Sequence, residues 1–220
     1  IDKIETEKRI EKLSEKLIGN VTKDFDELIN LCDSIVSGIS NGDEFAFTAR
    51  NILKGEKREK DSIVVVKNAS KYVSIPQILL RNNYPINEVI LIDKDGKAVK
   101  AATKTVFSDL VPLDLSNRMY YKTHTENTSW DFDRSFAKKI YIESIKSYNS
   151  GNQETAISFS LYNDSIFNRK APYLAITSHI PSLYDQVIPQ DVEFVIIDQS
   201  GKVLFHSEQS KNLHENFLIE

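Results

Sequence analysis

A short turn pattern occurs twice in this chain and predicts two β-hairpins. Residues 88–99, EVILIDKDGKAV, run through consecutive apolar residues into Asp93, two more polar residues and Gly96. This predicts a β-hairpin, because glycine accepts the positive φ that a tight turn needs and aspartate tolerates the turn's first positions. Residues 193–204, EFVIIDQSGKVL, repeat the Glu, one Ile, the Asp, the Gly and the Lys at the same spacing. We interpret the pair as an internal repeat; the alternative is two hairpins that share only their turn chemistry.

An arginine and two tyrosines follow the first hairpin. A helix-start pattern leads into Arg118, Tyr120 and Tyr121, which fall on one short predicted helix. A guanidinium can hold a carboxylate through two parallel hydrogen bonds, so this helix beside a sheet edge predicts a pocket for a small anion. The alternatives are a salt bridge from the arginine to Asp114 or Asp131, and tyrosines that only fill the core.

Composition limits the classes of function. With 28 basic and 32 acidic residues among 220, the net charge is −4, which gives no electrostatic case for nucleic-acid binding. The single cysteine, Cys32, excludes an internal disulfide. There is no signal peptide and no apolar run of about 18 residues. Because the chain begins at Ile1 without a methionine, we expect it to be a piece of a longer protein.

A long helix is predicted from Ile1 to about Ser40, because apolar residues recur there at steps of mostly three and four. The apolar stripe is narrow as far as Leu17 and broadens from Val21. We therefore expect the first turns either to pair with a partner helix or to protrude as a stalk. The alternative is a helix that lies flat on the domain throughout.

The next 45 or so residues are predicted to be mainly helical. The chain is expected to stop the first helix at 41–43, to form helices at 44–53 and 61–72 around a charged loop at 55–60, and to break at Pro76.

Beyond the arginine helix, residues 123–136 show no periodicity and are predicted to be a loop, which carries the only tryptophan, Trp130. That side chain is either a local plug or a ligand contact, since loops on a rigid sheet often carry function. Alternating or apolar runs predict strands at 139–145, 155–161 and 173–180, and a short helix at 182–187. Five antiparallel strands with helices before and between them predict an α+β fold with a one-sided sheet.

The order of these elements resembles the extracytoplasmic double Cache sensor domain, a family with PAS-like folds found in bacterial histidine kinases, chemoreceptors and cyclases. The motifs that carry the resemblance are I-D-x-D-G-K at 92–97, D-L-S-x-R-x-Y-Y at 114–121 and I-D-x-x-G-K-V-L-x-H at 197–206. The resemblance implies a long N-terminal helix and lead-in at 1–62, a membrane-distal ligand-binding module at 63–186, and the start of an apparently incomplete membrane-proximal module at 187–220. It also implies membrane helices that flank the domain in the parent protein and a location on the periplasmic or extracellular face of the membrane.

The resemblance also implies a ligand site. The family's pocket usually has an arginine and an aromatic residue on the helix after the first hairpin, a tyrosine on the next strand and, in the amino-acid-binding subgroup, an aspartate near the end of the last strand. Here Ser178 or His179 stands where that aspartate is expected, so a carboxylate or another small anion without an amine fits better than an amino acid. The candidate ligand-binding residues are Arg118, Tyr120, Tyr121, Trp130, Tyr141, Ser178 and His179.

An enzymatic function is not expected. The four histidines at 124, 179, 206 and 214 lack paired ligand spacing, and no phosphate loop or nucleophile motif is present, so we expect no metal and no cofactor. The expected function is ligand sensing, in which the ligand closes 123–136 onto Arg118 and the displacement reaches a membrane helix, with a possible homodimer through the N-terminal helix. The alternatives are a protein–protein interaction module without a small-molecule ligand and, less favoured, an unrecognised hydrolase.

Overall fold

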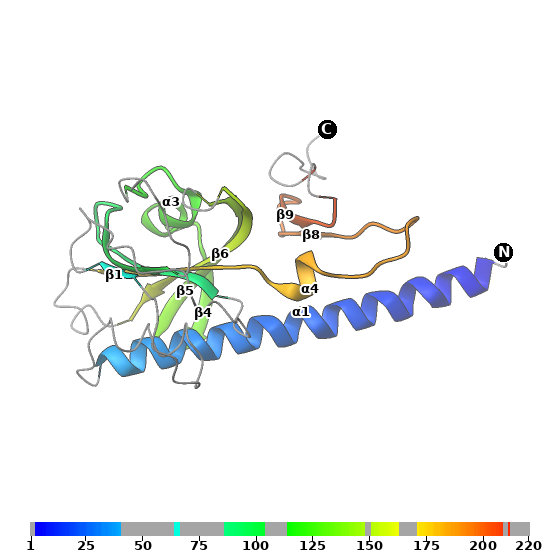
Figure 1. The fold of residues 1–220 in the computed structure, drawn as a ribbon, viewed down its shortest axis with the longest axis horizontal. Coiled ribbons are helices and arrows are strands. Elements are labelled where there is room, and N and C mark those ends of the chain that lie inside the picture. The colour runs from blue at the N-terminus through cyan, green and yellow to red at the C-terminus, as the bar shows by residue number, and fades with distance from the viewer. Residues whose placement is uncertain are drawn as a thin grey trace.

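The computed structural model describes residues 3–40, 64–66, 86–103, 114–147, 151–162, 171–208 and 211. They form a long helix, a twisted antiparallel sheet and a separate two-stranded hairpin, which is the predicted α+β fold (Figure 1). The helices are α1 (Lys3–Ser40), α3 (Met119–Thr125) and α4 (Pro181–Tyr184). The strands are β1 (Val64–Val66), β2 (Ile86–Ile92), β3 (Ala98–Thr103), β4 (Trp130–Arg134), β5 (Ala137–Lys146), β6 (Gln153–Leu161), β7 (Tyr173–Ser178), β8 (Val195–Ile197) and β9 (Val203–His206).

The large sheet joins distant parts of the chain at its centre. Its order is β1-β3-β2-β7-β6-β5-β4, and every neighbouring pair is antiparallel. The first long strand of the sheet, β2, pairs with its last strand, β7. The two ends of the segment 86–178 therefore lie side by side. The three-residue strand β1 lies at one edge and β4 at the other.

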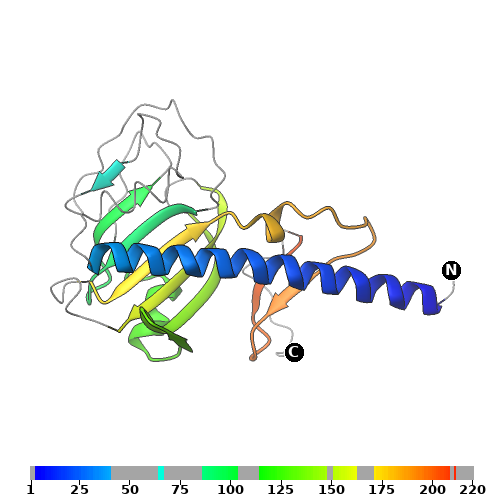
Figure 2. The ribbon, with the colours of Figure 1, turned by 90° about the horizontal axis from the view of Figure 1, so that it is seen from below.

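Both faces of this sheet are covered, so the expected one-sided sheet is wrong. Alternation along β6 sends Ile157 and Phe159 to a core cluster that includes α1, and Ala156 to a second cluster that includes α3. The face opposite α1 is covered because α3, which follows the first hairpin in the chain, packs on it. In Figure 2, α1 crosses the sheet obliquely.

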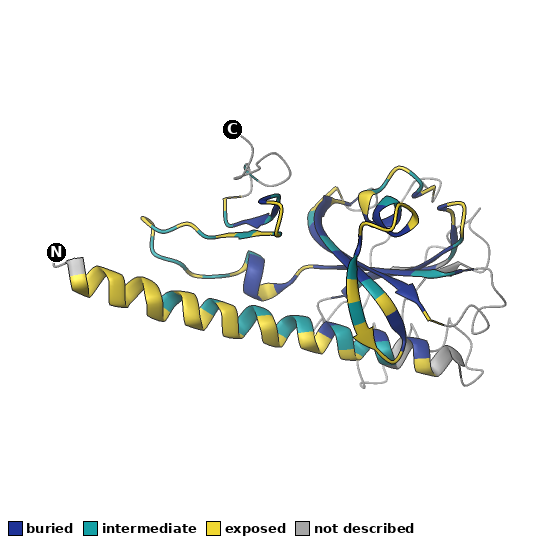
Figure 3. Ribbon diagram, turned by 180° about the vertical axis from the view of Figure 1, so that it is seen from behind, coloured by how far each residue is buried: buried dark blue, intermediate teal, exposed yellow. Residues whose placement is uncertain are grey.

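The long helix has an exposed half and a buried half. Residues 4–12 are all exposed, and Leu28, Cys32 and Val36 are buried against the sheet (Figure 3). This confirms that the helix reaches the body of the domain where its apolar stripe broadens, and it contradicts a helix that lies flat throughout. Burial raises the pKa of the Cys32 thiol, as expected of a small core residue. Within the described residues, no helix has the apolar length that a bilayer span requires.

Helix α4 links α1 to the end of the sheet. The side chain of Asp24 on α1 accepts a hydrogen bond of 3.0 Å from the backbone N–H of Ser182. This carboxylate satisfies one of the N–H groups that a helix start leaves without an intrahelical partner. The short helix predicted at 182–187 is therefore present, although it ends at Tyr184.

The two predicted hairpins share one turn conformation. Gly96 and Gly201 both have φ of 79°. In each turn the aspartate carboxylate, of Asp93 or Asp198, accepts the backbone N–H of the lysine after the glycine, at 2.8 and 3.1 Å. The hairpin repeat is therefore present in conformation as well as in sequence.

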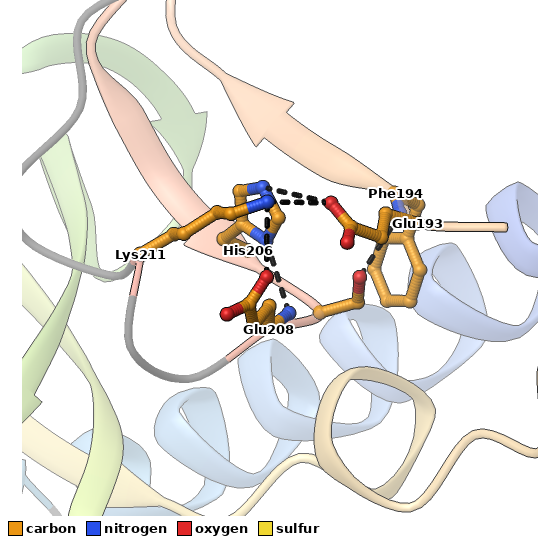
Figure 4. A network of polar contacts seen from close by, with 6 residues as sticks. Glu193, Phe194, His206, Glu208 and Lys211 are labelled. Carbon is orange, nitrogen blue, oxygen red and sulfur yellow. Dashed lines mark hydrogen bonds and ion pairs between the residues drawn. The ribbon is translucent and has the colours of Figure 1, made fainter. Parts of the chain in front are cut away.

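Figure 4 shows the polar network that closes the second hairpin. The amine of Lys211 lies 2.8 Å from a carboxylate oxygen of Glu193 and 2.9 Å from one of Glu208. Hydrogen bonding to Glu193, followed by that to Glu208, raises the pKa of Lys211. Nδ1 of the buried His206 accepts the Glu208 N–H at 3.0 Å. His206 therefore helps to hold the end of the second hairpin in place.

Two local predictions are wrong. The helix expected at 61–72 contains β1 instead, because three successive β-branched valines favour a strand. The loop expected at 123–136 contains the end of α3 and all of β4, where Trp130 pairs with Ile140 of β5.

The helix stop at 41–43, the helix at 44–53, the loop at 55–60 and the break at Pro76 lie outside the described residues.

Candidate functional site

The polar and aromatic side chains of interest gather on the sheet face that α3 covers. We call them the α3-face cluster and define it by its residues: Arg118, Tyr120, Tyr121, His124, Trp130, Tyr141, Glu143, Ser158, Tyr173 and Lys202. They come from α3, from the neighbouring strands β4 to β7 and from the turn of the second hairpin.

The first hairpin positions the arginine. The N–H of Leu115 donates to the carbonyl of Gly96 at 2.7 Å, and Lys97 and Asp114 form a β-bridge beside it. The N–H of Arg118 then donates to the carbonyl of Leu115 at 2.9 Å. The start of α3 is thus attached directly to the turn that the glycine makes possible.

The side chain of Arg118 turns toward the sheet. One terminal nitrogen, Nη2, donates to the carbonyl of Lys146 at 3.0 Å, at the end of β5, and the residue is half-buried. The two acids proposed as salt-bridge partners have other contacts: a carboxylate oxygen of Asp114 accepts the Ser116 N–H at 3.0 Å, and Asp131 lies 3.3 Å from Lys139. Hydrogen bonding by Ser116 holds the pKa of Asp114 below its usual value.

Glu143 on β5 lies against the start of α3. One of its oxygens accepts the backbone N–H of Tyr120 at 2.8 Å. Since α3 has no side-chain cap of its own, this strand residue satisfies an N–H at the helix start. Burial raises the pKa of Glu143, against the Tyr120 hydrogen bond and the attraction of Lys202 and Arg118. The carboxylate therefore links β5 to α3 and lies within the electrostatic influence of Lys202 and Arg118.

Tyr141, two residues earlier on the same face of β5, carries the contact to the second hairpin. The amine of Lys202 donates to its hydroxyl at 2.7 Å. The ring of Trp130 lies against it, with centroids 5.3 Å apart. Burial raises the pKa of Tyr141, and the lysine opposes that shift. Burial also acts to lower the pKa of Lys202, but its hydrogen bond to Tyr141 and the attraction of Glu143 give a net rise.

His124 is a buried, neutral member of the cluster. Its Nε2 lies 2.9 Å from the hydroxyl of Ser158, which itself donates to the carbonyl of Tyr120 at 2.8 Å. Because the hydroxyl proton is used, Nε2 must be the donor and Nδ1 an acceptor; Nδ1 is buried and has no hydrogen-bond partner among the described residues. Desolvation lowers the pKa of His124 to about 4. The imidazole is stacked on Tyr173, with centroids 5.5 Å apart.

The structure brings five of the seven predicted site residues together on this face. Tyr120 is buried with only 3% of its surface exposed, and the hydroxyl of Tyr121 donates to the carbonyl of Lys94 at 2.7 Å. Tyr120 therefore lies in the core, and Tyr121 links α3 to the first hairpin. The five residues are Arg118, Tyr120, Tyr121, Trp130 and Tyr141.

Ser178 and His179 lie elsewhere. Ser178 follows Leu174 and Ile176 in the alternation of β7, on the α1 side of the sheet. The imidazole of His179 lies 3.0 Å from Asp185 and stacks on Tyr184, with centroids 4.6 Å apart. The structure does not bring these two side chains to Arg118.

Sequence reasoning missed Glu143, His124 and Lys202 as members of the cluster. For Glu143 a signal existed, because a residue two positions after Tyr141 on a strand must share its face. The placement of the other two depends on how α3 and the second hairpin dock. Among the described residues, no group of three or more His, Cys, Asp or Glu side chains is placed to hold a metal ion.

The described residues form an α+β domain with a two-sided antiparallel sheet. Aromatic rings, two basic side chains and the buried carboxylate of Glu143 gather beneath the short helix α3. No protein-family model and no curated protein matches this chain.

Proposed function

We propose that this chain is the extracytoplasmic sensor domain of a bacterial transmembrane signalling protein of the double Cache type, such as a histidine kinase, chemoreceptor or cyclase. Its ligand is a small anionic metabolite that carries a carboxylate and binds at the α3-face cluster. The observation that carries the proposal is the half-buried guanidinium of Arg118, which contacts the end of β5 at the start of the helix that carries Tyr120 and Tyr121. A planar guanidinium suits bidentate binding of a carboxylate.

The contacts of Arg118 suggest how binding changes the domain. A carboxylate that takes the guanidinium competes with the carbonyl of Lys146, which Nη2 now contacts at 3.0 Å. The start of α3 is held by Glu143 on one side and by the Gly96 turn on the other. A ligand shifts such an equilibrium only by its difference in affinity for the two arrangements. The charged contact with Arg118 supplies that difference.

The architecture supports a division into the proposed modules. The pairing of β2 with β7 closes the segment that we assign to the membrane-distal module. Helix α4 and the second hairpin then lie along α1, toward its exposed N-terminal half (Figure 1). We infer that this half of α1 runs toward the membrane of the parent protein and passes the ligand-dependent displacement to it.

A thermal-shift screen tests the ligand site. Small carboxylates should raise the melting temperature of the wild type, because a ligand at 100 times its Kd adds about 2.7 kcal/mol to the stability of the folded state. Arg118→Ala should abolish the shift. Arg134→Ala, which removes an exposed arginine on the edge strand β4, should leave it unchanged. Equal shifts in wild type and Arg118→Ala would remove the proposed site.

A protein–protein interaction module is the second candidate, and one observation favours it. Tyr120 is buried and Trp130 packs on Tyr141, as expected if the aromatic residues simply fill this face. The exposed Ile4, Ile10 and Ile18 on α1 would then be part of a contact with a second chain. Sedimentation velocity measures this directly: a monomer at every accessible concentration argues against pairing through α1, and a dimer with no carboxylate response favours the interaction module.

A further inference from the structure

Helix α4 lies where α1, the large sheet and the second hairpin meet (Figure 1). A carboxylate oxygen of Asp24 on α1 accepts the N–H of Ser182 at 3.0 Å. The last residue of the helix, Tyr184, stands edge-on to the ring of Phe205 in the second hairpin, with centroids 5.0 Å apart. The hydroxyl of the same tyrosine lies 3.2 Å from the hydroxyl of Thr155 on β6. One side chain therefore contacts both the sheet and the hairpin.

The surface beneath Tyr184 is a row of hydroxyl groups. Ser144 on β5, Thr155 on β6 and Ser178 on β7 are cross-strand neighbours on the α1 side of the sheet, and all three are buried. Elsewhere along these strands the same face carries isoleucine, leucine and phenylalanine. Both Ser144 and Thr155 hydrogen-bond the Tyr184 hydroxyl. The apolar core therefore gives way to hydrogen bonds where α4 docks.

Hydroxyl contacts make this joint easier to open than an apolar one. A hydrogen bond between neutral groups adds little net stability, because water replaces each partner when the contact breaks. Separating packed apolar side chains instead exposes their surface to water. The ring contact with Phe205 and the hydrogen bond from α4 to Asp24 do not involve the hydroxyl row. They can therefore persist when Tyr184 leaves the sheet.

The stretch of β5 that carries Ser144 also carries contacts of α3 on its other face. Nη2 of Arg118 donates to the carbonyl of Lys146 at 3.0 Å, and Glu143 accepts an N–H at the helix start. Neighbouring residues on a strand point to opposite faces, so a displacement of this stretch moves both the start of α3 and the hydroxyl row. The end of β5 therefore connects the α3-face cluster to α4.

We propose that Tyr184 is the coupling residue between the large sheet and the second hairpin. Its hydroxyl links the ends of β5 and β6 to Phe205, so that a change at the Arg118 contact alters how firmly β8 and β9 are held. This coupling is a property of the fold and holds whether or not a carboxylate binds. The contact between Lys202 and Tyr141 also joins the hairpin to β5, but on the α3 side and through side chains alone.

Amide hydrogen exchange of the whole chain, followed by mass spectrometry, tests the coupling. Tyr184→Phe removes the hydroxyl and keeps the ring against Phe205, so exchange in residues 194–206 should become about fivefold faster, the factor that one net hydrogen bond provides. Exchange in the centre of β6 and β7 should not change. Tyr162→Phe, the same change at an exposed tyrosine, should match the wild type in both regions. Thr155→Val, which removes the partner hydroxyl and keeps the branched shape, should match Tyr184→Phe.

A double-variant cycle measures the coupling itself. Arg118→Ala releases the end of β5 and should speed exchange in the second hairpin by about twofold or more. In the Tyr184→Phe background the same change should have no further effect on the hairpin, because the link is already broken. This non-additivity distinguishes coupling from a purely structural role, for which the two effects would add.

Several results would overturn the inference. Hairpin exchange could be unchanged in Tyr184→Phe, or Arg118→Ala could have no effect on the hairpin or the same effect in both backgrounds. A response to Arg118→Ala that is lost in Lys202→Met and kept in Tyr184→Phe would assign the coupling to the α3 side. Thr155→Val gives the same comparison if Tyr184→Phe does not fold. Because no carboxylate is added, each of these results leaves the proposed function to its own thermal-shift test.

Discussion

Gly96 has a positive φ and lies close to Ser116, and replacing it by alanine should be destabilising for both reasons. Its φ is 79°, a conformation that alanine adopts at a cost of about 1–2 kcal/mol. A Cβ at this position would also lie 2.6 Å from Cα, 2.8 Å from Cβ and 2.9 Å from N of Ser116. Two of these three atoms are backbone, so the new methyl group cannot be accommodated by rotating a side chain.

The magnitude follows from those two terms. Strain of about 1–2 kcal/mol and overpacking of about 1–3 kcal/mol are partly offset by about 0.4–1 kcal/mol of lost unfolded-state entropy. We therefore expect Gly96→Ala to reduce the free energy of unfolding by about 1–5 kcal/mol, with about 3 kcal/mol at the centre of that range. Gly151 is the matched control, since its φ is 69° but nothing lies within 4 Å of the point that a methyl group there would occupy. Gly151→Ala should cost about 1 kcal/mol or less.

Urea denaturation of the two variants measures the difference. The structure also predicts where the clash is relieved: Ser116 must move, and it lies between Leu115, which is bonded to the Gly96 carbonyl, and Arg118. If the proposed function is right, Gly96→Ala should therefore reduce the carboxylate-induced thermal shift, and Gly151→Ala should not. Equal losses of stability in the two variants would refute the argument from the close approach to Ser116.

Two further predictions concern pH. Desolvation lowers the pKa of His124 from 6.5 to about 4. As the pH falls, the unfolded chain therefore takes up a proton before the folded chain does, and about 3 kcal/mol of stability present above pH 6.5 is lost by about pH 4. Urea titrations should show that His124→Gln lacks this loss and that His179→Gln, at an exposed position, retains it. Burial raises the pKa of Glu143 above 4.5, so the folded state holds its proton more tightly and stability falls as the pH rises from 4.5 through that raised value. Glu143→Gln keeps an acceptor for the Tyr120 N–H, and should be more stable than wild type near neutral pH with the difference vanishing below pH 4.5; a lower stability at neutral pH would contradict this sign.

The elements with strong local signals could be predicted from the sequence. The stripe of α1 has the helical period over its whole length, and its broadening at Val21 anticipates the burial of Leu28, Cys32 and Val36. The turns at Gly96 and Gly201 follow from residue chemistry alone, because a positive φ strongly favours glycine. For these elements the tertiary structure agrees with local preference.

The missed elements depend on pairing partners that are distant or weakly signalled. The alternation of Trp130 and Phe132 with exposed aspartates is a strand signal, but it is too short to stand out until β5 pairs with it. The family resemblance predicts Ser178 near Arg118, but the alternation of β7 places it on the other face of the sheet. A shift of one residue on a strand reverses the face that a side chain occupies.

The difference between Lys97 and Lys202 shows what local sequence leaves open. Both turns use the same aspartate, glycine and lysine, and both form the same backbone hydrogen bonds. Only the second turn docks on β5, so only Lys202 exchanges solvent for the hydroxyl of Tyr141 and the attraction of Glu143. Glu143 in turn caps the helix that follows Arg118. A change in charge at Arg118, Glu143 or Lys202 must therefore alter the electrostatic environment of the others, because both cations attract Glu143. If the proposed function is right, an anion bound at Arg118 changes the electrostatic environment of the second hairpin through Glu143.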